Sequence, residues 1–192
     1  MMHRSSILAL SLMIGGTIHP VLAQTQRYPT PQELESLITP LQSRIATVQN
    51  SRPYRNQRTT AEKQRLATLV KAWSTLDPAV APFLGEWRAI EETKSIYPSR
   101  TRGRVCIVQH ELPASIRDNG LSLSFGTIAN GQIQTEAFSI LVRQGDFLGA
   151  AFVQNNHPYL YEYGNRGPLK ASVDQQIRDR FNQAGCLTGL PK

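Results

Sequence analysis

The chain has 192 residues, of which 40% are hydrophobic, and its formal net charge at pH 7 is +7. This length is enough to bury a core, and it corresponds to one domain or to one domain with an extension. Beyond the N-terminus no apolar stretch is long enough to span a bilayer, which excludes a protein built on transmembrane helices. The positive charge suits anionic partners such as lipid surfaces or acidic polysaccharides.

The first 23 residues predict a secretory signal peptide. Residues 1–6 form a short positive start, residues 7–18 form an apolar run, and Val21 and Ala23 occupy the −3 and −1 positions before Gln24. Cleavage after Ala23 would release a secreted or periplasmic protein. The fold is therefore expected within residues 24–192.

Residues 24–78 predict an N-terminal helical hairpin. Two Thr-x-x-Glu capping boxes mark the starts of its helices, at Thr30-x-x-Glu33 and at Thr59-x-x-Glu62. Apolar residues recur at three- and four-residue steps in both segments, so each helix has one apolar face. Pro40 interrupts the first segment and predicts a kink or two shorter helices. The apolar faces either pack on the rest of the chain, which is the usual arrangement, or receive a partner.

From residue 83 the apolar pattern changes to a period of two, which predicts an antiparallel β-domain within residues 79–192. Six strands are expected, at residues 86–97, 104–110, 121–128, 132–143, 147–154 and 159–163. Turn signals such as Asn130-Gly131 separate them, and a phase change within the fourth strand predicts a bulge near Ala137. The predicted fold is therefore α+β, with the helical hairpin beside an antiparallel meander sheet or partial barrel.

A third helix is expected to close this domain. Ser172-x-x-Gln175 predicts its start and Gly185 its end. The chain has two cysteines, Cys106 within a predicted strand and Cys186 just after the helix. In an oxidising compartment this count predicts one disulfide, which would join the helix to the sheet. The alternative, a redox or metal-binding pair, lacks the Cys-x-x-Cys spacing.

The stretch Gly85-Glu86-Trp87 stands where helical periodicity ends and strand periodicity begins. A glycine two residues before a large aromatic residue allows close backbone approach while the ring plugs the end of a sheet. This Gly-x-Trp motif at the entry of the first strand resembles the lipocalin (calycin) superfamily. The resemblance implies an antiparallel barrel whose floor is closed by Trp87 and whose interior holds a small apolar ligand. The alternative is a buried tryptophan that anchors another kind of sheet.

Two features depart from the lipocalin pattern. No arginine can be assigned from the sequence as the partner that normally covers the tryptophan. In addition, about 90 residues separate Phe83 from the C-terminal helical pattern, which is short for eight strands with their loops.

Tyr159, Tyr161 and Tyr163 alternate along the last predicted strand and therefore share one face of it. Tyrosines presented in this way line a ligand pocket, or they belong to the core with their hydroxyl groups at its rim. Together with Trp87 they are the candidate ligand-binding residues.

Arg100, Arg102 and Arg104 lie around a glycine in a predicted loop. Three guanidinium groups so close together would bind phosphate or sulfate on an anionic surface or an envelope protein, or would simply be hydrated. Nucleic acid is not an expected partner, because base stacking needs a groove that follows the backbone, of which the sequence has no sign.

The sequence contains no nucleophile elbow, metalloprotease motif or phosphate-binding loop, and neither a metal nor a cofactor is expected. The leading prediction is an exported, non-enzymatic binding protein for a small apolar or amphipathic ligand. The second is an interaction module, which would expose an apolar helix stripe through Leu66 and Trp73. The third is a secreted nuclease or hydrolase that uses His110 and His157 with a lysine such as Lys170, although no motif in the chain would bring them together.

Overall fold

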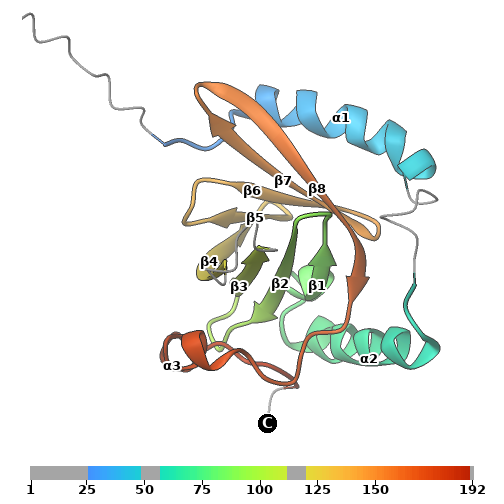
Figure 1. The fold of residues 1–192 in the computed structure, drawn as a ribbon, viewed down its shortest axis with the longest axis vertical. Helices are drawn as coiled ribbons and strands as arrows, with labels where there is room; N and C mark the ends of the chain where they lie inside the picture. The colour runs from blue at the N-terminus through green and yellow to red at the C-terminus, as the bar shows by residue number, and fades with distance from the viewer. Residues whose placement is uncertain (1–25, 49–56, 112–119, 191–192) are drawn as a thin grey trace, which may run out of the picture.

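The computed structural model describes residues 26–48, 57–111 and 120–190 (Figure 1). The predicted signal peptide lies outside these residues. The helices are α1 (Pro31–Val48), α2 (Thr60–Leu76) and α3 (Gln175–Gln183), and a 3-10 turn, η1 (Ala81–Phe83), precedes the strands. The strands are β1 (Gly85–Arg88), β2 (Glu92–Pro98), β3 (Arg104–Glu111), β4 (Leu121–Ala129), β5 (Gln132–Thr135), β6 (Ile140–Gln144), β7 (Phe147–Gln154) and β8 (His157–Gly167).

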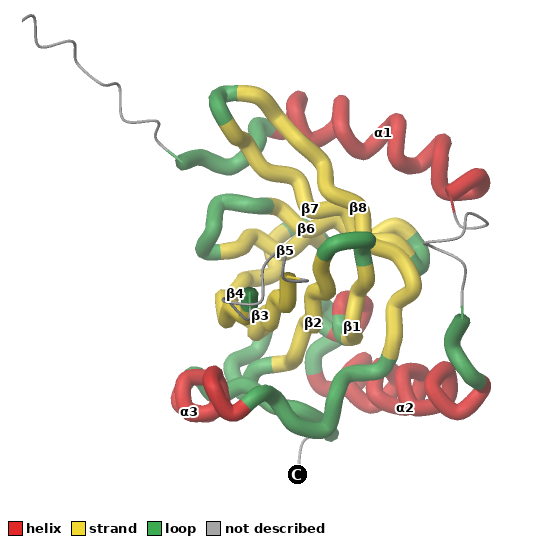
Figure 2. The backbone as a smooth tube through the Cα atoms, viewed as in Figure 1, coloured by secondary structure: helices red, strands yellow, loops and turns green. Residues whose placement is uncertain are grey.

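The strands form one closed antiparallel barrel (Figures 1 and 2). Each strand pairs with the next along the chain, and β8 returns to pair with β1. The predicted α+β class is confirmed, and the alternative between an open sheet and a barrel is decided in favour of a barrel. Closure pairs the backbone groups that two edge strands would otherwise expose.

Two of the predicted strands are each divided in two, which raises the number of strands from six to eight. Predicted strand 86–97 is interrupted by a turn between β1 and β2, in which the Ala89 N–H donates a 2.9 Å hydrogen bond to the Glu92 carbonyl. Predicted strand 132–143 is broken by a tight turn rather than a bulge. In this turn Phe138 has a positive φ of 58°, and the Ser139 N–H donates to Thr135 Oγ1 at 3.1 Å. Shorter strands let the same number of residues close a barrel.

The side chains that point into the barrel form the main core with residues from outside it. Trp87, Ile107 and Leu148 come from the strands, while α2 adds Leu69 and Trp73. The apolar face of α2 is therefore buried against the barrel, which confirms packing within the chain.

Helix α1 packs separately, on the outer face of β7 and β8 (Figure 1). Leu34 of α1 joins a cluster with Ile140, Val142 and Ala151. The helix continues through Pro40 as a single element of 18 residues, so the alternative of two shorter helices is wrong. Pro40 is on the exposed side, where water can satisfy the carbonyl group that its missing N–H leaves unpaired. None of the described helices is both long and apolar enough to cross a membrane.

Helix α3 covers another part of the outer barrel surface. Its N-cap is Asp174, whose side chain accepts from the Gln176 N–H at 2.9 Å, and not the predicted Ser172. The predicted disulfide between Cys106 of β3 and Cys186 is present, and it joins the end of α3 to the barrel across a sequence separation of 80.

Candidate ligand-binding site

A cavity of about 1010 Å³ extends from the barrel interior to the loops at one end, where it is open. Its described lining at this end includes Ile90 of the β1–β2 loop, Phe138 of the β5–β6 loop, Gln154 at the end of β7 and Gly120 just before β4. The antiparallel register places alternate residues of each strand on the interior face. As a result the cavity has two chemically different walls, one aromatic and one polar.

The aromatic wall comes from β7 and β8, where Leu148 pairs with Tyr163, Ala150 with Tyr161 and Phe152 with Tyr159. Tyr163 is the deepest of the three tyrosines, Tyr161 is half-buried, and Tyr159 is 44% exposed at the rim. Tyr161 and Tyr163 line the cavity with their ring centroids 5.2 Å apart. Tyr159 instead stacks on Phe152, which lines the cavity itself.

The polar wall comes from β2 and β3, where Lys94 pairs with Gln109 and Glu92 with Glu111. Lys94 Nζ donates to Gln109 Oε1 at 2.5 Å, and Gln109 Nε2 donates to Glu92 Oε2 at 2.5 Å and to Glu111 Oε1 at 3.1 Å. The Tyr163 hydroxyl donates to the other oxygen of Glu92, and the Lys94 ammonium lies 5.3 Å from the centre of the Tyr163 ring. This network connects the two walls of the cavity.

Burial shifts the pKa values of two groups in this network. The pKa of Glu92 is raised, mainly because its carboxylate is desolvated and also because Glu111 and Glu91 repel it; Lys94 opposes the shift. Desolvation lowers the pKa of Lys94, and the two carboxylates Glu92 and Glu111 only partly counteract this. Both shifts favour the neutral form of the side chain.

Trp87 does not line the cavity. It is fully buried in the core at the opposite end of the barrel, and its indole N–H donates to the Phe83 carbonyl at 2.8 Å. Gly85 before it has φ +140°, and a Cβ atom there would lie 2.8 Å from the Gly167 carbonyl oxygen. The glycine is therefore required where β1 meets β8, and the tryptophan forms a packed floor rather than a ligand contact.

Arg166 covers the Trp87 ring, with the guanidinium carbon 5.2 Å from the ring centre. Arg166 is buried, with an exposed fraction of 5%, and its guanidinium group donates hydrogen bonds to the carbonyl oxygens of Leu84 and Ala81. The sequence alone does not single out Arg166, because strict alternation from Tyr163 would point its side chain outward. The pairing of β1 with β8 shifts register here, at Asn165 with φ 51°, and turns Arg166 inward.

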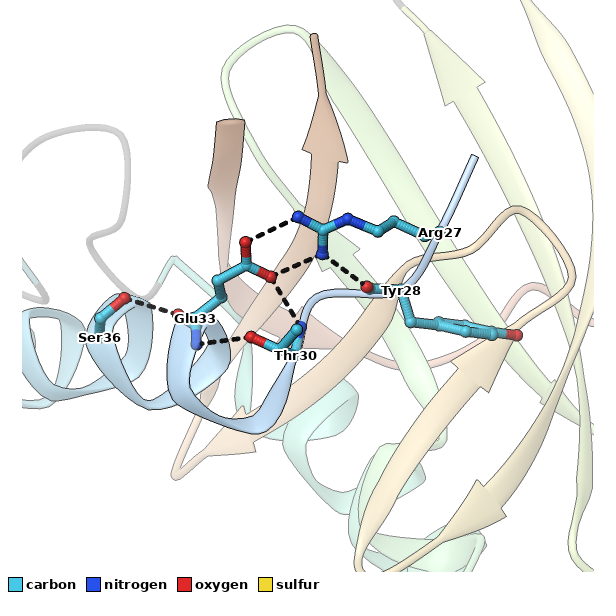
Figure 3. Close-up of polar contacts among 5 residues, drawn as sticks. All are labelled: Arg27, Tyr28, Thr30, Glu33 and Ser36. Atoms are coloured by element: carbon cyan, nitrogen blue, oxygen red, sulfur yellow. Dashed lines mark hydrogen bonds and ion pairs between the residues drawn. The ribbon is translucent and has the colours of Figure 1, made fainter. Parts of the chain in front are cut away.

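The segment before α1 forms part of the cavity rim, since Gln26 and Arg27 line the cavity. Arg27 binds both oxygens of Glu33, at 2.7 and 2.8 Å, and Glu33 also accepts from the N-cap N–H of Thr30 (Figure 3). Next to this clamp the Tyr28 ring lies 5.4 Å from the Phe138 ring, and its hydroxyl donates to the Thr135 carbonyl at 2.7 Å. These contacts fasten the N-terminal segment to the β5–β6 loop.

None of the three arginines of the predicted anionic-surface site lines this cavity. Arg100 and Arg102 belong to the β2–β3 loop, and Arg104 begins β3 and forms an ion pair at 3.7 Å with Glu136 of the β5–β6 loop. All three are exposed, and the loop is held by the Gly103 N–H, which donates to the buried Asp77 carboxylate at 2.6 Å. The structure therefore separates the two predicted binding sites.

His110 and Lys170 line a separate pocket of about 310 Å³ on the outer surface beside the start of α3. His157 lies at the β7–β8 turn and lines neither this pocket nor the barrel cavity. Among the described residues no group of three or more histidine, cysteine or acidic side chains is arranged to hold a metal ion.

The fold and the cavity define this chain as a closed, up-and-down antiparallel β-barrel protein with an internal pocket. This architecture, with Arg166 over Trp87, is compatible with the lipocalin resemblance. Comparisons with protein-family models, with curated proteins and with solved structures find no match.

Proposed function

We propose that this protein is an exported, non-enzymatic binding protein whose barrel holds a small apolar or amphipathic ligand. The observation that supports this proposal is the 1010 Å³ cavity with an aromatic wall, open at one end and floored at the other by the Trp87 core. Sites for small molecules are typically concave, largely apolar and of this size, with a few polar groups that orient the ligand. The Cys106–Cys186 disulfide supports export, because such bonds persist in oxidising compartments.

The first test is native mass spectrometry of the mature protein, purified gently from a host that exports it. A bound ligand would appear as a reproducible mass excess that disappears on denaturation. A mature chain that starts at Gln24 would at the same time support the predicted signal peptide.

The second test uses the apolar fluorophore N-phenyl-1-naphthylamine as a stand-in ligand. We expect saturable binding that Phe152→Ala weakens by about tenfold, which corresponds to about 1.4 kcal/mol of lost aromatic contact. Phe125→Ala is the matched control, since Phe125 is also half-buried but packs on the outer α3 side. Equal affinity in both variants and the wild type, or no saturable binding, would count against a ligand-binding barrel.

An anionic-surface module is the second candidate, because Arg100, Arg102 and Arg104 are exposed on one loop. Vesicles with anionic lipid should then bind the protein in low salt, and the triple substitution by glutamine should abolish that binding. Leu66 and Trp73 of α2 are only 7% and 5% exposed, so these two residues offer no apolar stripe to a protein partner.

A further inference from the structure

The cavity contains a lysine in an environment that is unusual for this residue type. Lys94 is 8% exposed and lines the cavity, whereas the other lysines that the structure describes (Lys63, Lys71 and Lys170) are exposed. A lysine is almost never buried without a charged partner. This one donates to the neutral amide of Gln109, and no described carboxylate lies within ion-pair distance of its Nζ atom.

We propose that Lys94 is a covalent attachment site, where its Nζ atom forms an imine with an apolar aldehyde or ketone bound in the cavity. This inference rests on the proposed function, since it assigns a chemical class to the ligand of the same cavity. The apolar part of the ligand would lie against the aromatic wall of Phe152 and Tyr161, with its carbonyl group at the polar wall.

The surroundings of Lys94 favour the first step, which is attack of the neutral amine on the carbonyl carbon. Only the unprotonated amine is nucleophilic, and desolvation lowers the Lys94 pKa toward that form. The Gln109 carbonyl oxygen, at 2.5 Å, holds the Nζ atom at the cavity wall. Addition gives a neutral carbinolamine in which the proton lost by nitrogen has moved to the former carbonyl oxygen.

The neighbouring carboxyl groups suit the second step. Loss of water from the carbinolamine requires a proton on its hydroxyl group. Glu92 is the candidate donor, because it shares Gln109 with Lys94 and its pKa is raised by burial. The C–O bond breaks, water leaves, and the nitrogen becomes a positively charged iminium while Glu92 is left as a carboxylate. Glu92 and Glu111, both bound to Gln109, then supply negative charge beside that cation.

The test is reductive trapping with 2-naphthaldehyde and cyanoborohydride on the folded protein, followed by peptide mapping. Lys94 should acquire the naphthylmethyl group at least about tenfold faster than Lys71, because binding in the cavity holds the aldehyde beside its Nζ atom and desolvation favours its neutral amine. In urea the two lysines should react at similar rates. Labelling of Lys94 in the folded protein no faster than Lys71 would overturn the inference, and this comparison needs no variant that has to fold.

Two further measurements complete the design. Lys94→Met should lose the fast labelling while Lys71→Met keeps it. The alcohol 2-naphthalenemethanol, which cannot form an imine, should bind reversibly and compete with labelling of Lys94. If the alcohol binds the cavity but the aldehyde does not select Lys94, the imine is refuted and the proposed function stands. If neither molecule binds, both are refuted.

Discussion

Replacing Arg166 by methionine removes the guanidinium group from the barrel floor but keeps an apolar stem of similar length. In the native protein this group donates to Leu84 O at 2.8 Å and to Ala81 O at 3.1 Å, and it stacks on Trp87. The substitution leaves the buried Leu84 carbonyl oxygen without its Arg166 donor, at a cost of about 1–3 kcal/mol. The Ala81 oxygen keeps a 3.4 Å hydrogen bond from the Leu84 N–H, so its loss is smaller. Loss of the cation–π contact adds about 0.5–2 kcal/mol.

The cost of burying a charge works in the opposite direction. Desolvation lowers the pKa of Arg166 to about 10, with the charge of Arg143 as a smaller cause. Because the methionine variant buries no charge, it avoids this desolvation cost, which offsets part of the lost stability. We therefore expect a net destabilisation of about 2 kcal/mol, which is equivalent to a fall in Tm of about 4–8 °C for a chain of this size.

Urea unfolding followed by tryptophan fluorescence measures this difference, with the disulfide kept intact. Arg102→Met is the matched control, because Arg102 is exposed, and its effect should stay within about 0.5 kcal/mol. A loss below about 1 kcal/mol for Arg166→Met, or equal losses in the two variants, would refute the role of Arg166 in closing the barrel floor.

Three other predictions concern stability. Burial raises the pKa of Tyr97 from 10.0 to about 12, and the charge of Glu86 is a smaller cause. Because Tyr97 ionises at lower pH in the unfolded chain than in the folded protein, the free energy of unfolding should fall between pH 10 and 12. Tyr97→Phe should remove that part of the pH dependence in denaturant titrations. Breaking the bond between Cys106 and Cys186, by reduction or with Cys186→Ser, should cost about 2–5 kcal/mol, and an unchanged denaturation midpoint would contradict this. Gly85→Ala should destabilise the protein by about 1–3 kcal/mol, because Gly85 has a φ of +140° and its new Cβ atom would meet the Gly167 carbonyl oxygen. Gly131→Ala is the control, since a Cβ atom there meets no atoms and only the backbone strain is added. Equal losses in the two variants would contradict the close approach of Gly85 to Gly167.

Local sequence patterns were sufficient for the elements whose causes are local. The Thr59-x-x-Glu62 capping box starts α2 as predicted, with both of its reciprocal hydrogen bonds formed. The alternation of Tyr159, Tyr161 and Tyr163 places them on one face, and the count of two cysteines predicts the disulfide. Each of these features depends on neighbours within a few residues or on the number of residues of one type, both of which the sequence displays directly.

The tertiary structure decided which face of each strand is the inside and where the strands end. Glu92, Lys94 and Gln109 have a polar pattern typical of a solvent face, yet barrel closure turns them into the wall of a cavity. Arg166 reaches Trp87 only because β8 shifts register where it meets β1, a pairing between strands at opposite ends of the domain. Such long-range pairing depends on the closure of the whole barrel, and no short stretch of sequence specifies it.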